Sequence, residues 1–306
     1  VAHACFSVER RRTFVGRLEV LAGIRAYATA NRRTALVVIG PPGSGKSALL
    51  ARGGQEFRAV SPAAHVVERY IGVTPASSNV RSLLESLCHE IGRAYAADAL
   101  DLPSEYRELV QEFPRRLALA TADRPLVIVL DALDQLTTAD NGRSLAWLPA
   151  ALPAHVSLLC SATLGDCAAV LEQKLPPAAH LQLTPLRPDE GDEVLGRWLV
   201  EASRTLQPAQ REVVREAFGH SGLPLWLKLA FEEARLWPSY APADPTCLAT
   251  DVPGIISQLF ERLSDEANHG PVLVAHALGY LGTARNGLTE DELLDVLALD
   301  PEVMGD

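Results

Sequence analysis

Residues 35–50 read ALVVIGPPGSGKSALL, and this stretch decides the fold. Residues 36–39 form a short apolar run of the kind that makes a buried strand. Residues 40–47 fit the pattern G-x-x-x-x-G-K-[ST], whose glycines let backbone N–H groups wrap around phosphates. From Ser47 the residues favour a helix, whose N-terminus adds partial positive charge beside the loop. Strand, loop and helix in this order predict a site for nucleotide phosphates.

The polar residues of the loop have distinct expected roles. Lys46 would neutralise the β- and γ-phosphates, as a catalytic as well as a binding residue, and the Ser47 hydroxyl would ligate Mg²⁺. The whole predicted phosphate-binding set is Gly40, Pro41, Pro42, Gly43, Ser44, Gly45, Lys46, Ser47 and Ala48.

A second apolar run supplies acidic partners for this loop. Residues 126–130 read LVIVL and are followed by Asp131, and Asp134 comes three residues later. An aspartate at the carboxyl end of a central parallel strand can hold the hydration shell of Mg²⁺ beside Ser47. We therefore predict Asp131 as a catalytic and metal-site residue. Asp134 is predicted as a catalytic residue that polarises the attacking water.

The next strand, predicted over residues 156–160, leads into two candidate sensor residues. These are Ser161 and Thr163, and a polar residue at this strand end could sense the γ-phosphate. The alternative is a simple strand-end cap, and the sequence does not separate the two.

The remaining patterns extend the fold to an α/β class with a parallel sheet. Further strands are predicted over residues 65–72 and 180–183, and apolar stripes indicate helices over 79–95 and 103–119. Strands alternating with helices predict a parallel sheet covered by helices on both faces. Ser78 is expected to cap the helix that follows it. Gly53 and Gly54 cost about 1 kcal/mol each inside a helix, so the helix after the loop is predicted to end near Arg52.

From Leu186 onward the chain is predicted to be helical. Two helices are expected to begin near Arg187 and Pro224, and two more are expected over residues 252–263 and 271–281. Thr289 is expected to cap a last helix that runs to about Leu297. Residues 238–253 are polar and proline-bearing, which indicates a boundary between domains.

Composition limits the possible partners. The 306 residues are 48% hydrophobic and carry a formal net charge of −10, which disfavours a broad nucleic-acid surface. Arg10, Arg11 and Arg12 could form a nucleic-acid arm, although such runs are more often a solvated face.

Cysteine usage and hydropathy bear on location. The five cysteines are scattered without zinc or disulfide spacing, which predicts a reducing, cytoplasmic location. No apolar run approaches the ~20 residues of a membrane span.

The chain begins with Val1, and its only methionine is Met304, so we expect a segment of a longer protein.

Seven segments in a fixed order resemble one family. The chain is similar to the NACHT-type branch of the STAND P-loop NTPases, nearest to the telomerase-associated and nephrocystin-like members. The segments are FVGR (14–17), GPPGSGKSALL (40–50), RYIGVTPASS (69–78), LVIVLDALDQL (126–136), LTPLRPDEGDEVL (183–195), GLPLWLKLA (222–230) and GLTEDELLDVL (287–297).

The resemblance implies a domain plan and a function. It implies a lead-in over 1–34 with the adenine-side motif, an NTPase core over 35–184, a helical lid over 185–245 and a truncated winged helix over 246–306. It implies a signal-transduction ATPase in which ADP holds a closed form and ATP permits opening and self-association. Val15, Gly16 and Arg17 would lie near the adenine, and Pro224 would line the base. Repeats that sense a ligand would follow outside this sequence.

Two departures from the family pattern concern hydrolysis. Many members have glutamate where Gln135 stands, and many have an arginine after the sensor strand, where this chain reads Ser161-Ala162-Thr163. Slow hydrolysis is therefore expected. The alternatives are a nucleotide-binding scaffold that never hydrolyses ATP, and an origin-type or transcription-type DNA-binding ATPase. Residues 287–306 carry Glu290, Asp291, Glu292, Asp295 and Asp300 and have no Lys or Arg, which disfavours DNA binding.

Overall fold

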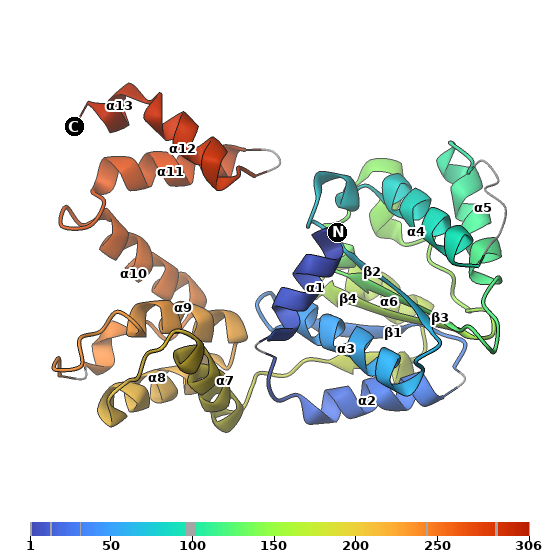
Figure 1. Ribbon diagram of the computed structural model, residues 1–306, viewed down its shortest axis with the longest axis horizontal. Helices are drawn as coiled ribbons and strands as arrows, with labels where there is room; N and C mark the ends of the chain where they lie inside the picture. The colour runs from blue at the N-terminus through green and yellow to red at the C-terminus, as the bar shows by residue number, and fades with distance from the viewer. Residues whose placement is uncertain are drawn as a thin grey trace. The chain divides into compact units, whose positions relative to one another are not determined.

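The chain divides into two compact units, residues 1–186 and residues 187–306. The computed structural model describes residues 2–12, 14–30, 32–95, 102–242, 244–284 and 287–305 (Figure 1).

The first unit is built on a five-stranded sheet in which every paired strand is parallel, as predicted. The strand order is β2-β3-β4-β1-β5, so β1 and β3 are both interior and β2 is at one edge. Gly40 pairs in register with Thr163 and Tyr70 with Asp131, which brings the carboxyl ends of the strands to one edge of the sheet. The strands are β1 (Leu36–Gly40), β2 (His65–Tyr70), β3 (Leu126–Asp131), β4 (Val156–Thr163) and β5 (His180–Gln182).

Helices cover both faces of this sheet (Figure 1). One buried cluster joins Leu36 and Val38 of β1 to helices α2 (Leu18–Thr29) and α3 (Lys46–Val60). The other joins Val37 and Ile39 to helices on the opposite face, namely α4 (Val80–Ala94), α5 (Tyr106–Leu117) and α6 (Asp166–Lys174). Helix α1 (Ala2–Arg12) packs against α3 and β2. Strands covered on both faces read as continuous apolar runs, which is why they were visible in the sequence.

Helix α3 does not end near Arg52, and that prediction is wrong. It continues through both glycines to Val60. A Cβ on Gly53 would lie 2.8 Å from Leu159 Cδ2, and one on Gly54 would lie 2.5 Å from Glu68 Oε1. The glycines therefore let the helix approach the sheet, and the packing gained offsets their low helix propensity.

Two local predictions on the following helices also need correction. Ser78 does not cap α4, because it belongs to a 3-10 turn. Asn79 is the cap, with extended backbone and a side-chain oxygen that accepts from Ser82 N at 3.1 Å. Helix α5 begins at Tyr106, three residues later than predicted, because Glu105 is still extended. The 3-10 turns are η1 (Pro75–Ser78), η2 (Leu133–Gln135), η3 (Ala139–Ser144), η4 (Pro177–Ala179) and η5 (Pro245–Cys247).

The second unit contains no strand in the residues described. Its helices are α7 (Pro188–Glu201), α8 (Pro208–Ser221), α9 (Pro224–Ala234), α10 (Val252–Ser264), α11 (Pro271–Thr283), α12 (Glu290–Ala298) and α13 (Pro301–Met304). Thr289 caps α12 as predicted, whereas α13 was not foreseen. Phe218 and Trp226 pack together in the core of the first three helices. The lid and winged-helix assignments remain predictions.

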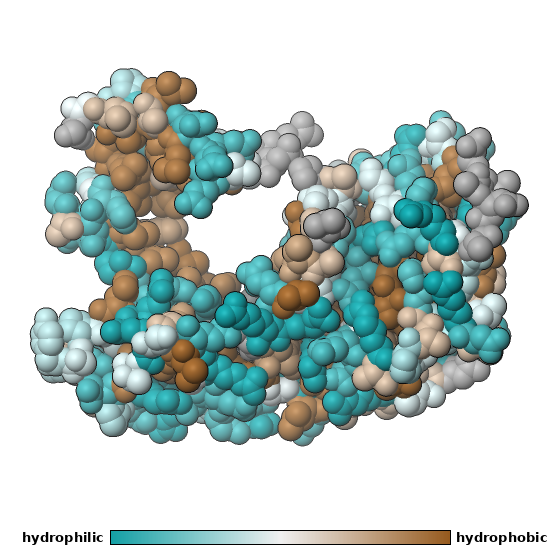
Figure 2. All heavy atoms as spheres, viewed as in Figure 1, coloured by the Kyte–Doolittle hydropathy of each residue, from teal (hydrophilic) through white to brown (hydrophobic). Residues whose placement is uncertain are grey.

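Apolar side chains are exposed on the last helices of this unit. Figure 2 shows this surface over α11 to α13, where Leu281, Leu294 and Leu299 are exposed. None of the helices within the described ranges is both long enough and apolar enough to cross a bilayer.

Candidate functional site

The loop between β1 and α3 has the backbone that its glycines make possible. Gly43 and Gly45 have positive φ angles of 75° and 90°, which favour glycine. A Cβ on Gly40 would lie 2.9 Å from both Leu183 Cβ and Ser44 Oγ, so only glycine fits where the strand ends. Ala48 lies in the first turn of α3, so the predicted set from Gly40 to Ala48 is one contiguous loop and helix start.

Lys46 is held inside this loop. Its ammonium donates to the carbonyl oxygens of Gly40 at 2.9 Å and Pro41 at 3.0 Å, and the residue is 9% exposed. Burial lowers the pKa of Lys46, while Asp134 and Asp131 raise it. Neutral carbonyls only partly satisfy a buried ammonium, so a bound phosphate would be a stronger partner.

Asp131 is buried at the end of β3 and forms a short hydrogen-bond chain. The Ser161 hydroxyl donates to Asp131 Oδ1 at 2.6 Å and accepts from Ala132 N at 2.8 Å. Burial raises the pKa of Asp131, and hydrogen bonds from Ser161 and Ser47 oppose that rise. The Ser161 hydroxyl thus positions Asp131 from a fully buried place on β4.

Ser47 and Asp131 fit the requirements of Mg²⁺. They place a hydroxyl and a carboxylate, both hard oxygen ligands, within hydrogen-bonding reach of each other. No cluster of three or more His, Cys, Asp and Glu in the described parts of the chain could hold a metal alone. An ion at Ser47 and Asp131 would therefore take its other ligands from water and phosphate, as Mg²⁺ commonly does.

Asp134 lies at the same edge of the sheet. Its Oδ1 accepts from the backbone N–H of Thr163 at 2.8 Å, which ties η2 to the end of β4. The neighbouring Gln135 is exposed and packs against Gly72, where an added Cβ would lie 2.1 Å from Gln135 Oε1. The structure thus brings together Lys46, Asp131 and Asp134, three of the residues that the sequence offered as candidates.

The segment 14–17 also reaches this loop. Gly16 and Arg17 both have positive φ angles, of 69° and 57°. The turn aims the Arg17 guanidinium at two carbonyl oxygens, that of Ser44 at 3.0 Å and that of Thr184. Val15 beside it is buried. The sequence could not foresee this contact, because the partners lie 27 and 167 residues away.

Pro224 stands apart from this cluster in the chain. It occupies the first turn of α9 in the second unit, as its sequence position predicted. Its role beside the base stays a prediction.

Comparisons with known proteins show what this chain is similar to. The AAA ATPase domain family matches residues 13–161. NACHT domain- and WD repeat-containing protein 1 of Homo sapiens is 36% identical over 99% of this chain and 20% of its own length. NACHT and WD repeat domain-containing protein 2 of Mus musculus is 37% identical over 89% of this chain and 16% of its own. Telomerase protein component 1 of Rattus norvegicus is 27% identical over 86% of this chain and 10% of its own.

The chain spans about a fifth or less of the length of these relatives. Among solved structures, the Aeropyrum pernix ORC1 protein in complex with DNA aligns with a TM-score of 0.44 and 15% identity, over 91% of this chain and 74% of its own. This chain carries an AAA-type, nucleotide-binding ATPase domain that contains the phosphate loop and its aspartates. The sequence matches show that the chain is a homologue of the NACHT-domain proteins.

Proposed function

We propose that this chain binds ATP and ADP with Mg²⁺ and works as a nucleotide-controlled conformational and assembly switch that hydrolyses ATP slowly. The observation that carries the proposal is the convergence of Lys46, Asp131 and Asp134 at the carboxyl ends of β1, β3 and β4. A cation held by neutral carbonyls, with two carboxylates close by, is what a Mg²⁺-bound polyphosphate requires.

Each side chain has a distinct part in this proposal. Lys46 leaves the carbonyls of Gly40 and Pro41 and pairs with the β- and γ-phosphates. Ser47 and Asp131 hold Mg²⁺, which neutralises charge that develops on the phosphates.

Water activation is assigned to Asp134, and phosphate sensing to the end of β4. Asp134 orients the attacking water, and its bond to Thr163 N holds it at the strand end. The sensor candidates stay Ser161 and Thr163, with Ser161 acting through Asp131.

A switch needs contacts that differ between nucleotide states. Arg17 supports such a difference, because it joins the phosphate loop at Ser44 to Thr184, two residues before the first unit ends at residue 186. We assign residues 185–245 to a lid that brings Pro224 to the base, and residues 246–306 to a winged helix. Self-association on opening, a ligand sensed by repeats outside this sequence, and a cytoplasmic location complete the proposal.

A scaffold that binds nucleotide without hydrolysis is the second candidate. Gln135 favours it, because an exposed amide at this position cannot act as a base. The two candidates share the binding site and differ in turnover alone.

The first test is the nucleotide that the protein carries through purification. Denaturing the protein and identifying what is released should give about one ADP per chain, and Lys46→Ala should release none. Slow Mg²⁺-dependent turnover of added ATP that Asp134→Asn abolishes would support the switch over the scaffold. An empty site that turns ATP over rapidly would contradict the switch, because a constitutive ATPase has no resting state to leave.

A further inference from the structure

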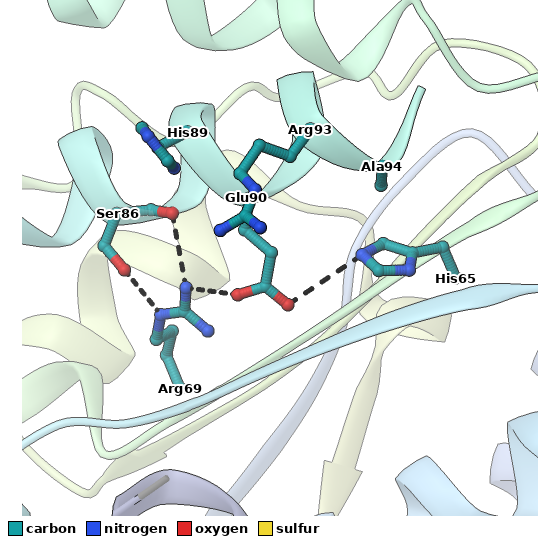
Figure 3. A pocket seen from close by; sticks show the side chains of 7 residues that line it. All are labelled: His65, Arg69, Ser86, His89, Glu90, Arg93 and Ala94. Atoms are coloured by element: carbon teal, nitrogen blue, oxygen red, sulfur yellow. Dashed lines mark hydrogen bonds and ion pairs between the residues drawn. The ribbon is translucent and has the colours of Figure 1, made fainter. Parts of the chain in front are cut away.

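A hollow of about 500 Å³ opens at the far edge of the sheet, between β2 and α4 (Figure 3). His65 and Arg69 line it from the strand, and Ser86, His89, Glu90, Arg93 and Ala94 line it from the helix. Strand β2 is the edge strand, and β3 and β4 separate it from β1 and the phosphate loop. The hollow is therefore distinct from the nucleotide site. Its volume is in the range of small-molecule pockets.

One arginine in this hollow is fixed in place. Arg69 donates its Nε to Ser86 Oγ at 2.9 Å and its Nη2 to Glu90 Oε2 at 2.6 Å, and its side chain is 11% exposed. This pairing uses the one acidic group that lines the hollow. Glu90 lies in the middle of the view in Figure 3, hydrogen-bonded to Arg69, while its other carboxylate oxygen is too far from His65 Nε2 for a hydrogen bond.

Three basic side chains in the hollow have hydrogen-bond donors without a protein partner. His65 Nε2 is buried without a hydrogen-bond partner, and lies 3.8 Å from Glu90 Oε1. A buried polar atom left unpaired costs stability, so this nitrogen is a site for a missing partner. His89 and Arg93 are exposed on α4, and neither side chain has a hydrogen bond or ion pair with any residue that the structure describes.

The charge of the hollow is positive in an otherwise acidic chain. It has two arginines against one glutamate, whereas the whole chain carries −10. Arg124 adds to this field, because it stacks on Tyr95, whose ring meets that of His65 edge-on. A local positive concavity concentrates anions even where the net charge would repel them.

We propose that this hollow, lined by the free donors of His65, His89 and Arg93 beside the fixed Arg69, binds a small molecule with a phosphate group. The free donors come from the strand on one side and the helix on the other. A tetrahedral phosphate offers oxygens in all these directions, whereas a planar carboxylate offers two in one plane. Arginine is the residue that suits this recognition.

The test uses pyrophosphate as the probe and the whole 306-residue chain carrying Lys46→Ala, which weakens phosphate binding at the loop. We expect calorimetry to show pyrophosphate binding that weakens with salt, and the ring signals of His65 and His89 to shift in NMR spectra. Adding His89→Ala and Arg93→Ala should weaken binding by about tenfold or more. Adding Glu90→Gln should strengthen it, because the amide keeps an acceptor for Arg69 without the competing charge.

Arg81→Ala is the matched control, because Arg81 lies on the same helix outside the hollow, paired with Glu85 at 3.4 Å. It should leave pyrophosphate binding unchanged. Three results would overturn the proposal: no binding in the Lys46→Ala chain, an equal loss in Arg81→Ala, or citrate binding as tightly as pyrophosphate. No binding in the Lys46→Ala chain would place all phosphate binding at the loop. An equal loss in Arg81→Ala would mean that any positive charge on the helix attracts pyrophosphate. Equally tight binding of citrate would mean that the hollow does not prefer phosphate.

Discussion

At the residue scale, Asp131 is kept where its charge is costly. The side chain is 3% exposed, and burial raises its pKa despite the hydrogen bonds from Ser161 and Ser47. An ionised carboxylate held out of water destabilises the fold unless a cation pairs with it. The residue that we assign to Mg²⁺ is thus a source of instability in the nucleotide-free protein.

Asp131→Asn should therefore stabilise the nucleotide-free chain and impair its function. The amide keeps the size of the side chain and an oxygen that accepts from Ser161, and it removes the charge. We expect the free energy of unfolding at pH 7, measured in urea, to rise by about 1 kcal/mol or more. Mg²⁺-dependent nucleotide binding should fall. Asp123→Asn on the exposed surface is the control, with a change within about 0.5 kcal/mol.

The pH dependence of this effect follows from its sign. A carboxyl whose pKa is raised on folding keeps its proton up to a higher pH in the folded state than in the unfolded state. The stability of the fold therefore falls as pH rises from the pKa of the unfolded state toward the pKa of the folded state. The variant should lack that fall. Equal stability of the two proteins from pH 4 to pH 7 would contradict the assignment.

The sequence pointed to the residues of this candidate site but not to how they are held. Lys46, Asp131 and Asp134 were found because local patterns mark the loop and the end of an apolar strand. Their supports, Ser161 and Arg17, contact partners on other strands and segments. Such contacts depend on strand order, and a single sequence does not encode that order in any local pattern.

At the element scale, tertiary packing overrides helix propensity in α3. Gly53 is a poor helix former in isolation, yet a Cβ there would meet Leu159 Cδ2 at 2.8 Å and Ile24 Cδ1 at 3.4 Å. The strands were predictable because each is a continuous apolar run. The length of α3 was not predictable, because its glycines are needed only for the close approach of the helix to the sheet.

Alanine should have opposite effects at two helical glycines. Gly53→Ala should lower the free energy of unfolding by about 1–3 kcal/mol, because the methyl group overpacks a core face. Gly279→Ala in α11 should raise it by about 0.5–1 kcal/mol, because nothing lies within 4 Å of a Cβ there. Urea unfolding of both variants checks the pair. A gain in stability for Gly53→Ala would mean that α3 does not need its close approach to the sheet.

A pH-dependent contact joins the last helices of the second unit. His276 Nδ1 lies 2.5 Å from Asp300 Oδ2, and the same carboxylate accepts from the Tyr280 hydroxyl. The hydrogen bond with Asp300 raises the pKa of His276, and Glu302 adds to the rise. Hydrogen bonds from Tyr280 and His276 lower the pKa of Asp300 to about 2.

The stability of α11 to α13 should therefore be highest in mildly acidic solution. The contribution of His276 is complete below its unfolded pKa of 6.5 and is lost as pH rises through the raised folded value. That of Asp300 is complete above 3.8 and is lost as pH falls toward about 2. Hydrogen exchange in these helices, corrected for its intrinsic pH dependence, should be faster at pH 9 than at pH 6. In His276→Ala this difference should vanish, and its persistence would assign the effect to other groups.

Over the whole molecule, one side chain links the phosphate loop to the segment that leads into the second unit. Arg17 donates to the carbonyl oxygens of Ser44 and Thr184, and the first unit ends at residue 186. A nucleotide that orders the loop should then also order residues 183–186. We expect ADP to slow hydrogen exchange in that segment as well as in the loop.

Arg17→Lys separates this coupling from binding. Lysine keeps the positive charge but lacks the fixed fork that reaches two carbonyl oxygens at once. ADP should still bind the variant and still protect the loop, because Lys46 and Ser47 are intact, while protection of residues 183–186 should fall by about half or more. Arg25→Ala, which removes an ion pair with Glu56 on the α2–α3 side, should leave that protection unchanged. The contradicting result is that ADP protects both segments from hydrogen exchange in the Arg17→Lys chain as strongly as in the unaltered chain. The coupling would then run through the backbone of β5 and the loop, because Leu183 already packs against Gly40 without Arg17.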